Sequence, residues 1–352
     1  MKTVGIGMIG SGFMGLTYSE AISRHAQGCR LIAVAGGRRA GRLAQDYGVD
    51  FEASVESLLA RADVAAVVLV TPDQDRARLT RLAAAAGKHV LAEKPMAPTV
   101  AECDQMIADC AAAGVNLGVV QTERFRKIAL RAKQLIDEGV LGPVRMMRTV
   151  SVFPLSLTKQ LIEDRRWSID ARSGGWFMSM ASHNCDFLRW LTGREAVKVF
   201  AQATTWSDIP APFLSVMAQI EFEAGIMAHL LISSELPSPS FPSSEVRFQV
   251  IGRDAMFDLE NMEFLDLGRG EKWERLYSPE RFDYLKEPKS PIRLYPHIGV
   301  IQEFVDSIRE GRAPKVGGAE GRAAVAICEA CLISAARGEV VTLRKSGKVS
   351  GA

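Results

Sequence analysis

The chain has 352 residues, of which 47% are hydrophobic and 24% are charged, and its 43 basic side chains stand against 41 acidic ones. This length predicts two domains of ordinary size, and the average composition excludes collagen-like, low-complexity and disordered chains. Because the net charge is only +2 and no long Lys/Arg block is present, we expect no nucleic-acid partner.

The first 120 residues alternate short apolar runs with longer amphipathic or alanine-rich runs, which is typical of βαβ units. We expect strands at Val4–Ile9, Arg30–Ala35, Val67–Val70, His89–Ala92 and Asn116–Val120. The expected helices between them are Met14–Ser23, Arg38–Tyr47, Ser54–Ala60, Asp75–Ala86 and Thr99–Ala113. Right-handed crossovers then predict a doubly wound parallel sheet, an α/β domain at residues 1–121.

After Val120 the pattern becomes that of an α+β domain, which we place at residues 122–352. The expected helices are Ile128–Glu138, Ala181–Leu191, Pro296–Glu310 and Gly318–Arg337. Strand-like runs spaced like hairpins predict an open mixed or antiparallel sheet from Val144–Val152, Phe213–Phe222, Gly225–Ser233, Glu245–Gly252 and Ala255–Leu259. The Pro/Ser-rich segment Pro237–Ser244 is interpreted as a surface loop.

The cysteines lie scattered in apolar or helical stretches, which indicates reduced thiols and a cytosolic protein: Cys29, Cys103, Cys110, Cys185, Cys328 and Cys331. Cys328 and Cys331 form a CxxC without a second pair or a nearby histidine, so we interpret them as core residues. With no HExxH and no calcium loop, we expect no metal. The absence of a signal-peptide pattern and of about 18 uninterrupted apolar residues argues against secretion and membrane insertion.

A glycine-rich turn directly follows the first strand and opens the first helix. It is a GxGxxG with Gly10, Gly12 and Gly15 at the fixed positions and Phe13 and Met14 between the last two. The first glycine permits the tight turn, the second lets backbone approach a pyrophosphate, and the third allows close packing of helix on strand. Because the helix N-terminus also attracts anions, this turn predicts a dinucleotide site.

The end of the second strand indicates which dinucleotide binds. An NAD-preferring site places an acidic residue about 20 residues after the turn, to hold the ribose hydroxyls. This chain has Gly36 there, followed by Gly37, Arg38 and Arg39. With no carboxylate to repel a 2′-phosphate and two guanidinium groups to receive it, we expect NADP to be preferred over NAD. The alternative is that Arg38 and Arg39 are only the solvated start of a helix.

Three further motifs occur in a fixed order along the chain. Thr71 and Pro72 follow the third expected strand, and Glu93, Lys94 and Pro95 follow the fourth, both at the strand ends where parallel sheets bind ligands. Later, a Gly-Gly pair precedes a His-x-x-Asp in a helical run: Gly174, Gly175, His183 and Asp186. Together with the opening turn, these motifs resemble the Gfo/Idh/MocA family of glucose–fructose oxidoreductase and inositol dehydrogenase relatives, and the resemblance spans nearly the whole chain.

The resemblance implies a Rossmann domain, a second domain on an open mixed sheet, and an active site between them. It further implies hydride exchange between nicotinamide and a secondary alcohol or ketone of a sugar, cyclitol or related polyol. By position, Lys94 corresponds to the lysine that hydrogen-bonds the reacting oxygen, and His183 corresponds to the general acid/base. Glu93 and Lys94 are also expected to contact the cofactor. The family often uses the sheet face for oligomerisation, so a homodimer or homotetramer is expected.

The chemistry requires these residue types independently of the family. Moving a hydride from an alcohol carbon leaves a proton on oxygen, so the site needs a base that titrates near neutrality and a donor that stabilises negative charge. His183 and Lys94 fit these roles. The structural alternatives are that Lys94 is a surface lysine beside a turn proline and that His183 packs within its helix.

The chain departs from its family one helical turn before the histidine. There the family usually has an aspartate, on the same helix face, and this chain has Ser179. Serine supplies no negative charge to support a histidine, although it can hydrogen-bond a substrate. Three interpretations stay open: a dehydrogenase that manages with His183 and Lys94, a redox-neutral enzyme using transient oxidation, or a catalytically inactive sensor.

Weaker substrate candidates are polar or aromatic residues near these motifs. An arginine can pair with a substrate carboxylate or hydroxyls, and a tryptophan can stack on a sugar face, although large aromatics more often lie in the core. The candidates are Arg124, Arg166, Trp167, Trp176, Tyr295 and His297.

Overall fold

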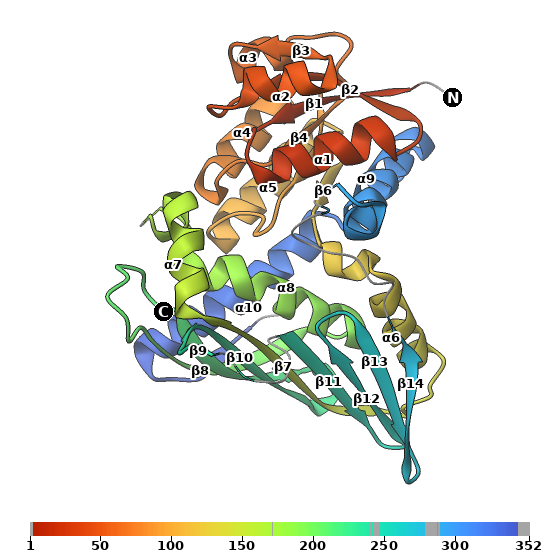
Figure 1. The fold of residues 1–352 in the computed structure, drawn as a ribbon, viewed down its shortest axis with the longest axis vertical. Coiled ribbons are helices and arrows are strands. Elements are labelled where there is room, and N and C mark those ends of the chain that lie inside the picture. Colours follow the sequence, from red (N-terminus) through yellow and green to blue (C-terminus); the bar gives the residue numbers. More distant parts are fainter. Residues whose placement is uncertain are drawn as a thin grey trace. The chain divides into compact units, whose positions relative to one another are not determined.

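The computed structural model describes residues 3–170, 172–239, 241, 246–278, 287 and 289–343. The chain forms two compact units (Figure 1). The first comprises residues 1–97, 101–125 and 281–322, and the second comprises residues 98–100, 126–280 and 323–352. The loop predicted at Pro237–Ser244 lies largely outside the described residues.

The first unit is a six-stranded parallel sheet with helices between its strands, which confirms the predicted doubly wound α/β fold. Its strand order is β3-β2-β1-β4-β5-β6. The strands are β1 (Val4–Ile9), β2 (Cys29–Ala35), β3 (Asp50–Glu52), β4 (Ala66–Leu69), β5 (His89–Ala92) and β6 (Leu117–Val119). The helices are α1 (Phe13–Arg24), α2 (Ala40–Tyr47), α3 (Val55–Leu59), α4 (Asp73–Ala85) and α5 (Val100–Ala112). The short, largely exposed edge strand β3 was not predicted.

All six strands of this sheet end level with one another, since Glu52 at the end of β3 is also the register partner of Ala35. The last residues of neighbouring strands are register partners: Ile9 with Ala35 and with Leu69, Leu69 with Ala92, and Ala92 with Val119. The residues that follow therefore emerge side by side along one edge. This edge, which we call the ligand edge, carries the glycine-rich turn after β1, the Thr71 and Pro72 motif after β4, and the motif of Glu93, Lys94 and Pro95 after β5.

A helix from late in the chain completes the first unit. Helix α9 (Pro291–Glu310) packs on α1, and its Val300 and Phe304 share a core with Ile6 and Leu91. The predicted first domain, residues 1–121, therefore lacks residues 281–322, which belong to the first unit. The helix begins at Pro291, where proline is tolerated because the first helical N–H has no partner, and the predicted start at Pro296 lies inside the helix.

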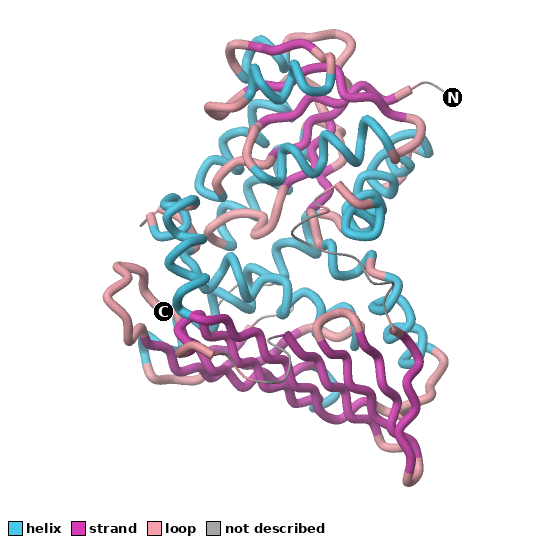
Figure 2. Tube along the Cα trace, in the orientation of Figure 1, coloured by secondary structure: helices cyan, strands magenta, loops and turns pink. Residues whose placement is uncertain are grey.

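The second unit is built on a nine-stranded mixed sheet in the order β14-β13-β12-β11-β7-β10-β9-β8-β15 (Figure 2). The strands are β7 (Val144–Pro154), β8 (Ala196–Thr204), β9 (Ser215–Phe222), β10 (Ile226–Leu236), β11 (Val246–Gly252), β12 (Ala255–Glu260), β13 (Phe264–Arg269), β14 (Lys272–Tyr277) and β15 (Val341–Thr342). Strand β7 pairs in parallel with β10 and antiparallel with β11. The expected open mixed sheet is confirmed.

Helices pack on one face of this sheet (Figure 1). They are α6 (Lys127–Asp137), α7 (Leu155–Asp164), α8 (Gly175–Thr192) and α10 (Gly318–Arg337), and short 3-10 turns lie at η1 (Thr122–Phe125), η2 (Arg166–Ile169) and η3 (Glu223–Gly225). Helix α7 and strands β8, β13, β14 and β15 were not predicted.

No described helix is long and apolar enough to cross a membrane. The six cysteines are free thiols, and the Sγ atoms of Cys185 and Cys328 lie 3.6 Å apart in the core of the second unit. Among the described residues, no group of three or more His, Cys, Asp or Glu side chains is arranged to hold a metal.

Candidate functional site

The three glycines of the turn lie in three different environments. Gly10 has a φ of 114°, and a Cβ there would lie 2.7 Å from the carbonyl oxygen of Val70. A Cβ on Gly15 would lie 2.6 Å from the Gly10 carbonyl oxygen, whereas one on Gly12 would meet nothing within 4 Å. Gly10 and Gly15 are therefore required by the fold itself, and Gly12 faces open space where a ligand can approach.

Helix α1 begins directly at this turn. Its N-cap is Gly12, which makes no side-chain cap hydrogen bond, and its first turn contains no acidic residue. The first N–H groups and the positive end of the helix dipole are thus suited to a phosphate. Phe13 in this turn is 47% exposed, and Arg293 of α9 lies over its ring, 4.8 Å from the centroid.

The loop after β2 is held against the glycine-rich turn. Gly36 and Gly37 have φ values of 75° and 82°, and a Cβ on Gly37 would lie 2.5 Å from Ser11 Oγ. The same Oγ accepts a hydrogen bond of 3.1 Å from the backbone N–H of Arg39. The side chains of Arg38 and Arg39 are exposed, and neither pairs with a carboxylate among the residues that the structure describes.

A buried arginine joins the loops after β4 and β5. Arg76 of α4 is 3% exposed. Its Nε and Nη2 donate to the Thr71 carbonyl oxygen over 3.1 and 2.7 Å, and its Nη1 donates to the carbonyl oxygens of Glu93, over 2.9 Å, and of Pro95. Burial lowers the pKa of this guanidinium, an effect that the carboxylates of Glu93 and Asp73 oppose.

Glu93 is a positioning carboxylate and not an exposed ligand. It is 5% exposed, its Oε1 accepts from the Tyr18 hydroxyl over 3.1 Å, and its Oε2 accepts from the Lys94 backbone N–H over 2.8 Å. Burial and the Glu93 carboxylate raise the pKa of Tyr18 well above its usual value. His297 of α9 lies edge-on to Tyr18, with its Nδ1 3.4 Å from the Tyr18 hydroxyl oxygen.

Lys94 follows β5 at the ligand edge, half-buried, with a cis peptide bond to Pro95. It lies in the same row of strand ends as the glycine-rich turn and the loop of Thr71 and Pro72. The structure thus brings the predicted cofactor residues of the first unit to one edge of one sheet.

His183 lies on α8, with Ser179 one turn earlier on the same face. Both are half-buried, in contrast to Asn184, Cys185 and Asp186, which point into the unit and are buried. The Asn184 amide donates to Thr149 Oγ1 over 2.6 Å and to Ser151 Oγ over 3.0 Å, both on β7. The buried face of α8 therefore fixes the helix on the sheet and holds His183 and Ser179 on its partly open face.

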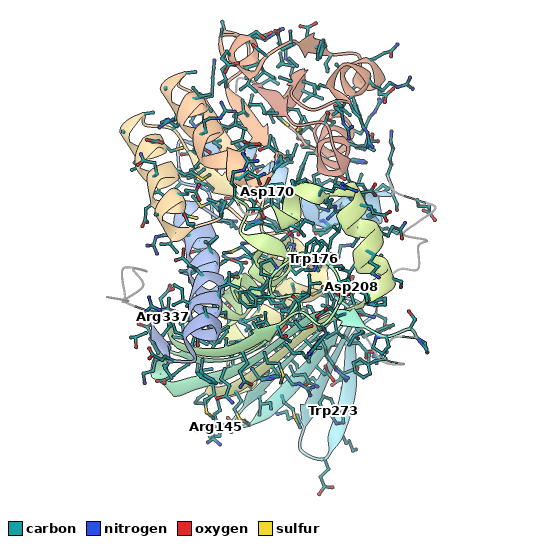
Figure 3. All side chains as sticks on the ribbon, turned by 90° about the vertical axis from the view of Figure 1, so that its left-hand side faces the viewer. Arg145, Asp170, Trp176, Asp208, Trp273 and Arg337 are labelled. Atoms are coloured by element: carbon teal, nitrogen blue, oxygen red, sulfur yellow. The ribbon has the colours of Figure 1, made fainter. Side chains whose placement is uncertain are left out.

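One of the two tryptophans considered for stacking on a sugar lies in the core. Trp176 is 3% exposed, packs with Ile162 and Leu214, and donates from its indole N–H to Ser234 Oγ over 2.8 Å. Its place among the helices and strands of the second unit is seen in Figure 3. The substrate role considered for Trp176 is therefore replaced by a packing role, because protein atoms cover the ring.

The remaining substrate candidates differ in exposure. Arg124 is 7% exposed, and its Nη2 forms an ion pair of 2.7 Å with Glu320 in the first turn of α10. Arg166 is exposed and Trp167 half-buried on η2, and Tyr295 is 42% exposed on α9. The charge of Arg124 is thus matched by a carboxylate of the protein, which favours a structural role.

Two family models match the chain over more than half of its length. A model described as "Oxidoreductase family, NAD-binding Rossmann fold" matches residues 4–121, and a "GFO/IDH/MocA C-terminal domain" model matches residues 129–258. The chain belongs to the Gfo/Idh/MocA oxidoreductase family.

Similar proteins agree with this membership of the Gfo/Idh/MocA family. An inositol 2-dehydrogenase of Rhizobium meliloti is 27% identical over 97% of this chain and 99% of its own length. A 2,7-anhydro-N-acetylneuraminate hydratase of Mediterraneibacter gnavus is 33% identical, but over 41% of this chain and 38% of its own length. The crystal structure of aldose-aldose oxidoreductase from Caulobacter crescentus, complexed with glycerol, matches with a TM-score of 0.83 and 25% identity, over 97% of this chain and 100% of that one.

Two residues that hold the loops of the ligand edge in this Gfo/Idh/MocA chain, Arg76 and Tyr18, were not predicted from the sequence. Both lie inside amphipathic helices, where arginine and tyrosine are ordinary residues, and both are fully buried in the fold. The available signal was position, because Arg76 follows the Thr71 and Pro72 motif by about one helical turn. Nothing in the sequence indicated that its partners are backbone carbonyls.

Proposed function

We propose that this chain is an NAD(P)-dependent dehydrogenase or reductase that acts on a secondary alcohol or ketone of a sugar, cyclitol or related polyol. The observation that carries the proposal is the ligand edge, where the glycine-rich turn and Lys94 follow strands that end level. The relative named inositol 2-dehydrogenase, aligned over nearly the whole chain, supports the substrate class.

The ligand edge has the properties that a dinucleotide needs. The open space at Gly12 allows close approach of a pyrophosphate, and the uncapped start of α1 offers N–H groups to it. When bound, the nicotinamide supplies the hydride acceptor or donor. The protein has to bind and orient the two reactants and to move one proton.

We assign the proton transfer to His183 and the stabilisation of the reacting oxygen to Lys94. A histidine titrates near neutrality and can accept the hydroxyl proton during oxidation or return it during reduction. An ammonium group stabilises negative charge that develops on the oxygen. Support comes from the half-buried placement of both side chains and from their match to the motifs of the family.

The direct test is an activity screen with NAD and NADP against inositols, aldoses and their keto forms. Replacing Lys94 or His183 by alanine should each lower kcat by about 10²–10⁴-fold, with cofactor affinity nearly unchanged. Lys159→Ala, at an exposed position of α7, is the control and should keep wild-type activity. Binding of neither dinucleotide would refute the proposal, and binding of cofactor and sugar without turnover would instead indicate a sensor.

We further propose that NADP is preferred over NAD. The support is the exposed Arg38 and Arg39 beside Gly36 and Gly37, with no acidic side chain between Cys29 and Asp46. A 2′-phosphate there meets two guanidinium groups, and the loop itself carries no carboxylate to repel it.

Calorimetry with matched arginine variants tests this preference. Arg38→Ala should weaken NADP binding about tenfold or more, a loss of about 1.4 kcal/mol, and should leave NAD binding unchanged. Arg42→Ala is the control, because Arg42, on the helix that follows, already pairs with Asp46 over 2.8 Å. NAD binding as tight as NADP binding to the wild type would contradict the preference.

A redox-neutral reaction is the second candidate. Ser179 in place of the usual family aspartate, together with the partial match to a hydratase, favours transient oxidation followed by elimination. Its signature is product formation without net change in nicotinamide absorbance. Stoichiometric reduction of NADP during turnover would exclude it.

A further inference from the structure

The buried side chain of Arg76 makes contacts that have no assigned role in the proposed hydride and proton transfers. Its guanidinium donates to three backbone carbonyl oxygens, those of Thr71, Glu93 and Pro95. Thr71 lies in the loop after β4, and the other two residues flank Lys94 in the loop after β5. One side chain thus fixes two neighbouring loops of the ligand edge.

The contacts are specific to the shape of a guanidinium. Thr71 accepts from Nε and Nη2, whereas Glu93 and Pro95 accept from Nη1 on the other side of the planar group. A lysine ammonium carries the same charge on a single nitrogen and cannot span both loops. Because Arg76 is only 3% exposed, water cannot replace the lost donors at low cost.

The opposite side of the same loop is held by a second set of contacts. Glu93 accepts the Lys94 backbone N–H with Oε2 and the Tyr18 hydroxyl with Oε1. The backbone of Lys94 is therefore fixed through both the carbonyl and the side chain of Glu93, while its own side chain remains half-buried at the edge.

We propose that Arg76 is a positioning residue for Lys94: it sets the backbone from which the Lys94 ammonium reaches the reacting oxygen. This inference rests on the proposed function of Lys94. A displacement of about 1 Å in a reacting group lowers a rate by about 10²-fold. Loss of the hydrogen bonds of the Arg76 guanidinium is therefore expected to lower kcat by displacing Lys94.

A double-mutant cycle tests this coupling. Arg76→Lys in the wild-type background should lower kcat about 10–100-fold. In a Lys94→Ala background the same substitution should change kcat less than about twofold, because the group that it positions is already gone. Arg322→Lys is the matched control: Arg322 is 8% exposed in the same unit and pairs with Asp104, so its replacement should lower stability and leave kcat unchanged. Equal losses of kcat in both backgrounds would overturn the proposal.

Hydrogen exchange supplies a readout that needs no turnover. In Arg76→Lys, the amide of Lys94 should exchange at least tenfold faster than in the wild type, and in Arg322→Lys it should not. If Arg76→Lys does not fold, Glu93→Gln weakens the same loop from the opposite side and should show the same faster exchange and the same non-additivity with Lys94→Ala. If exchange at the Lys94 amide is unchanged in a folded Arg76 variant, the positioning role is refuted. If exchange is faster in the variant but the wild type has no dehydrogenase activity, only the proposed function is refuted.

Discussion

Ser179 lies one helical turn before His183, and both side chains are half-buried on the same face of α8. A carboxylate at this position would favour the imidazolium form of His183, since opposite charges about 4–6 Å apart stabilise each other. We therefore expect Ser179→Asp to keep dehydrogenase activity and to shift the pH dependence of kcat to higher pH. Ser179→Asn is the control, because asparagine has nearly the shape of aspartate but no charge. It should show no shift in the pH dependence. Abolished turnover in the aspartate variant alone would instead indicate that the serine contacts the substrate.

Trp176 illustrates a residue whose role the sequence leaves open. Its position near a glycine pair fits a sugar platform as well as a core, and only burial decides between them. Trp176→Phe loses the hydrogen bond to Ser234 and leaves a buried hydroxyl without its donor. We expect the free energy of unfolding to fall by about 1–3 kcal/mol in denaturant titrations, with KM for substrate unchanged. Trp206→Phe, at a position 75% exposed, should be close to neutral, and a large rise of KM in Trp176→Phe would contradict the core assignment.

Helix α1 is connected to the loop after β5 by the hydrogen bond from Tyr18 to Glu93. Because burial and Glu93 raise the pKa of Tyr18 above its value in the unfolded chain, the neutral hydroxyl stabilises the fold below about pH 10. That stabilisation is lost as the pH rises further, since the unfolded tyrosine ionises first. The free energy of unfolding of the wild type should therefore fall more steeply above about pH 10 than that of Tyr18→Phe.

Chemical denaturation of both proteins at pH 7 and near pH 11 checks this expectation. Tyr295→Phe, at an exposed ring on α9, is the control and should follow the wild type at both pH values. Parallel pH profiles of wild type and Tyr18→Phe would contradict a pKa of Tyr18 that is raised by folding.

The elements that the sequence predicted are those with a strong apolar signal. Buried strands such as β1 and β4 consist almost entirely of apolar residues, and Gly48 ends α2 in the left-handed conformation that glycine favours. Strand β14 was missed because its alternation of lysine, tryptophan, glutamate and arginine has no apolar face: its residues are exposed or half-buried. The motifs located the ligand edge, but the contacts of Arg76 and Tyr18 depend on packing between segments far apart in sequence.

The sheet of the second unit has an exposed face with a methionine-rich row. Met227, Met146, Ile251 and Met256 are neighbours in register across β10, β7, β11 and β12, and the three methionines are 57%, 42% and 41% exposed. Next to this row, an open groove of about 730 Å³ is lined by Arg247, Asp258, Asp266, Trp273 and Arg275. We propose that this face mediates homo-oligomer formation, because contiguous exposed apolar surface marks interaction sites.

Sedimentation analysis of charged variants tests the assembly. Met227→Glu places a charge in the apolar row and should convert the oligomer to a smaller species at micromolar concentration. Trp206→Glu, at a position 75% exposed outside the row, should leave the assembly unchanged. A monomeric wild type would contradict the proposal.

The return of α9 to the first unit has a consequence for how the protein is made. Phe304 lies so close to β6 that a Cβ on Gly118 would be only 2.8 Å from its ring, and Val300 and Ile301 share its core. During synthesis, the first 125 residues leave the ribosome long before this helix exists, so the apolar surface that it covers stays open while the second unit is translated. A nascent chain halted before residue 291 should therefore expose this surface to chaperones, and a fragment of residues 1–125 should aggregate unless a peptide spanning 287–312 is supplied in trans.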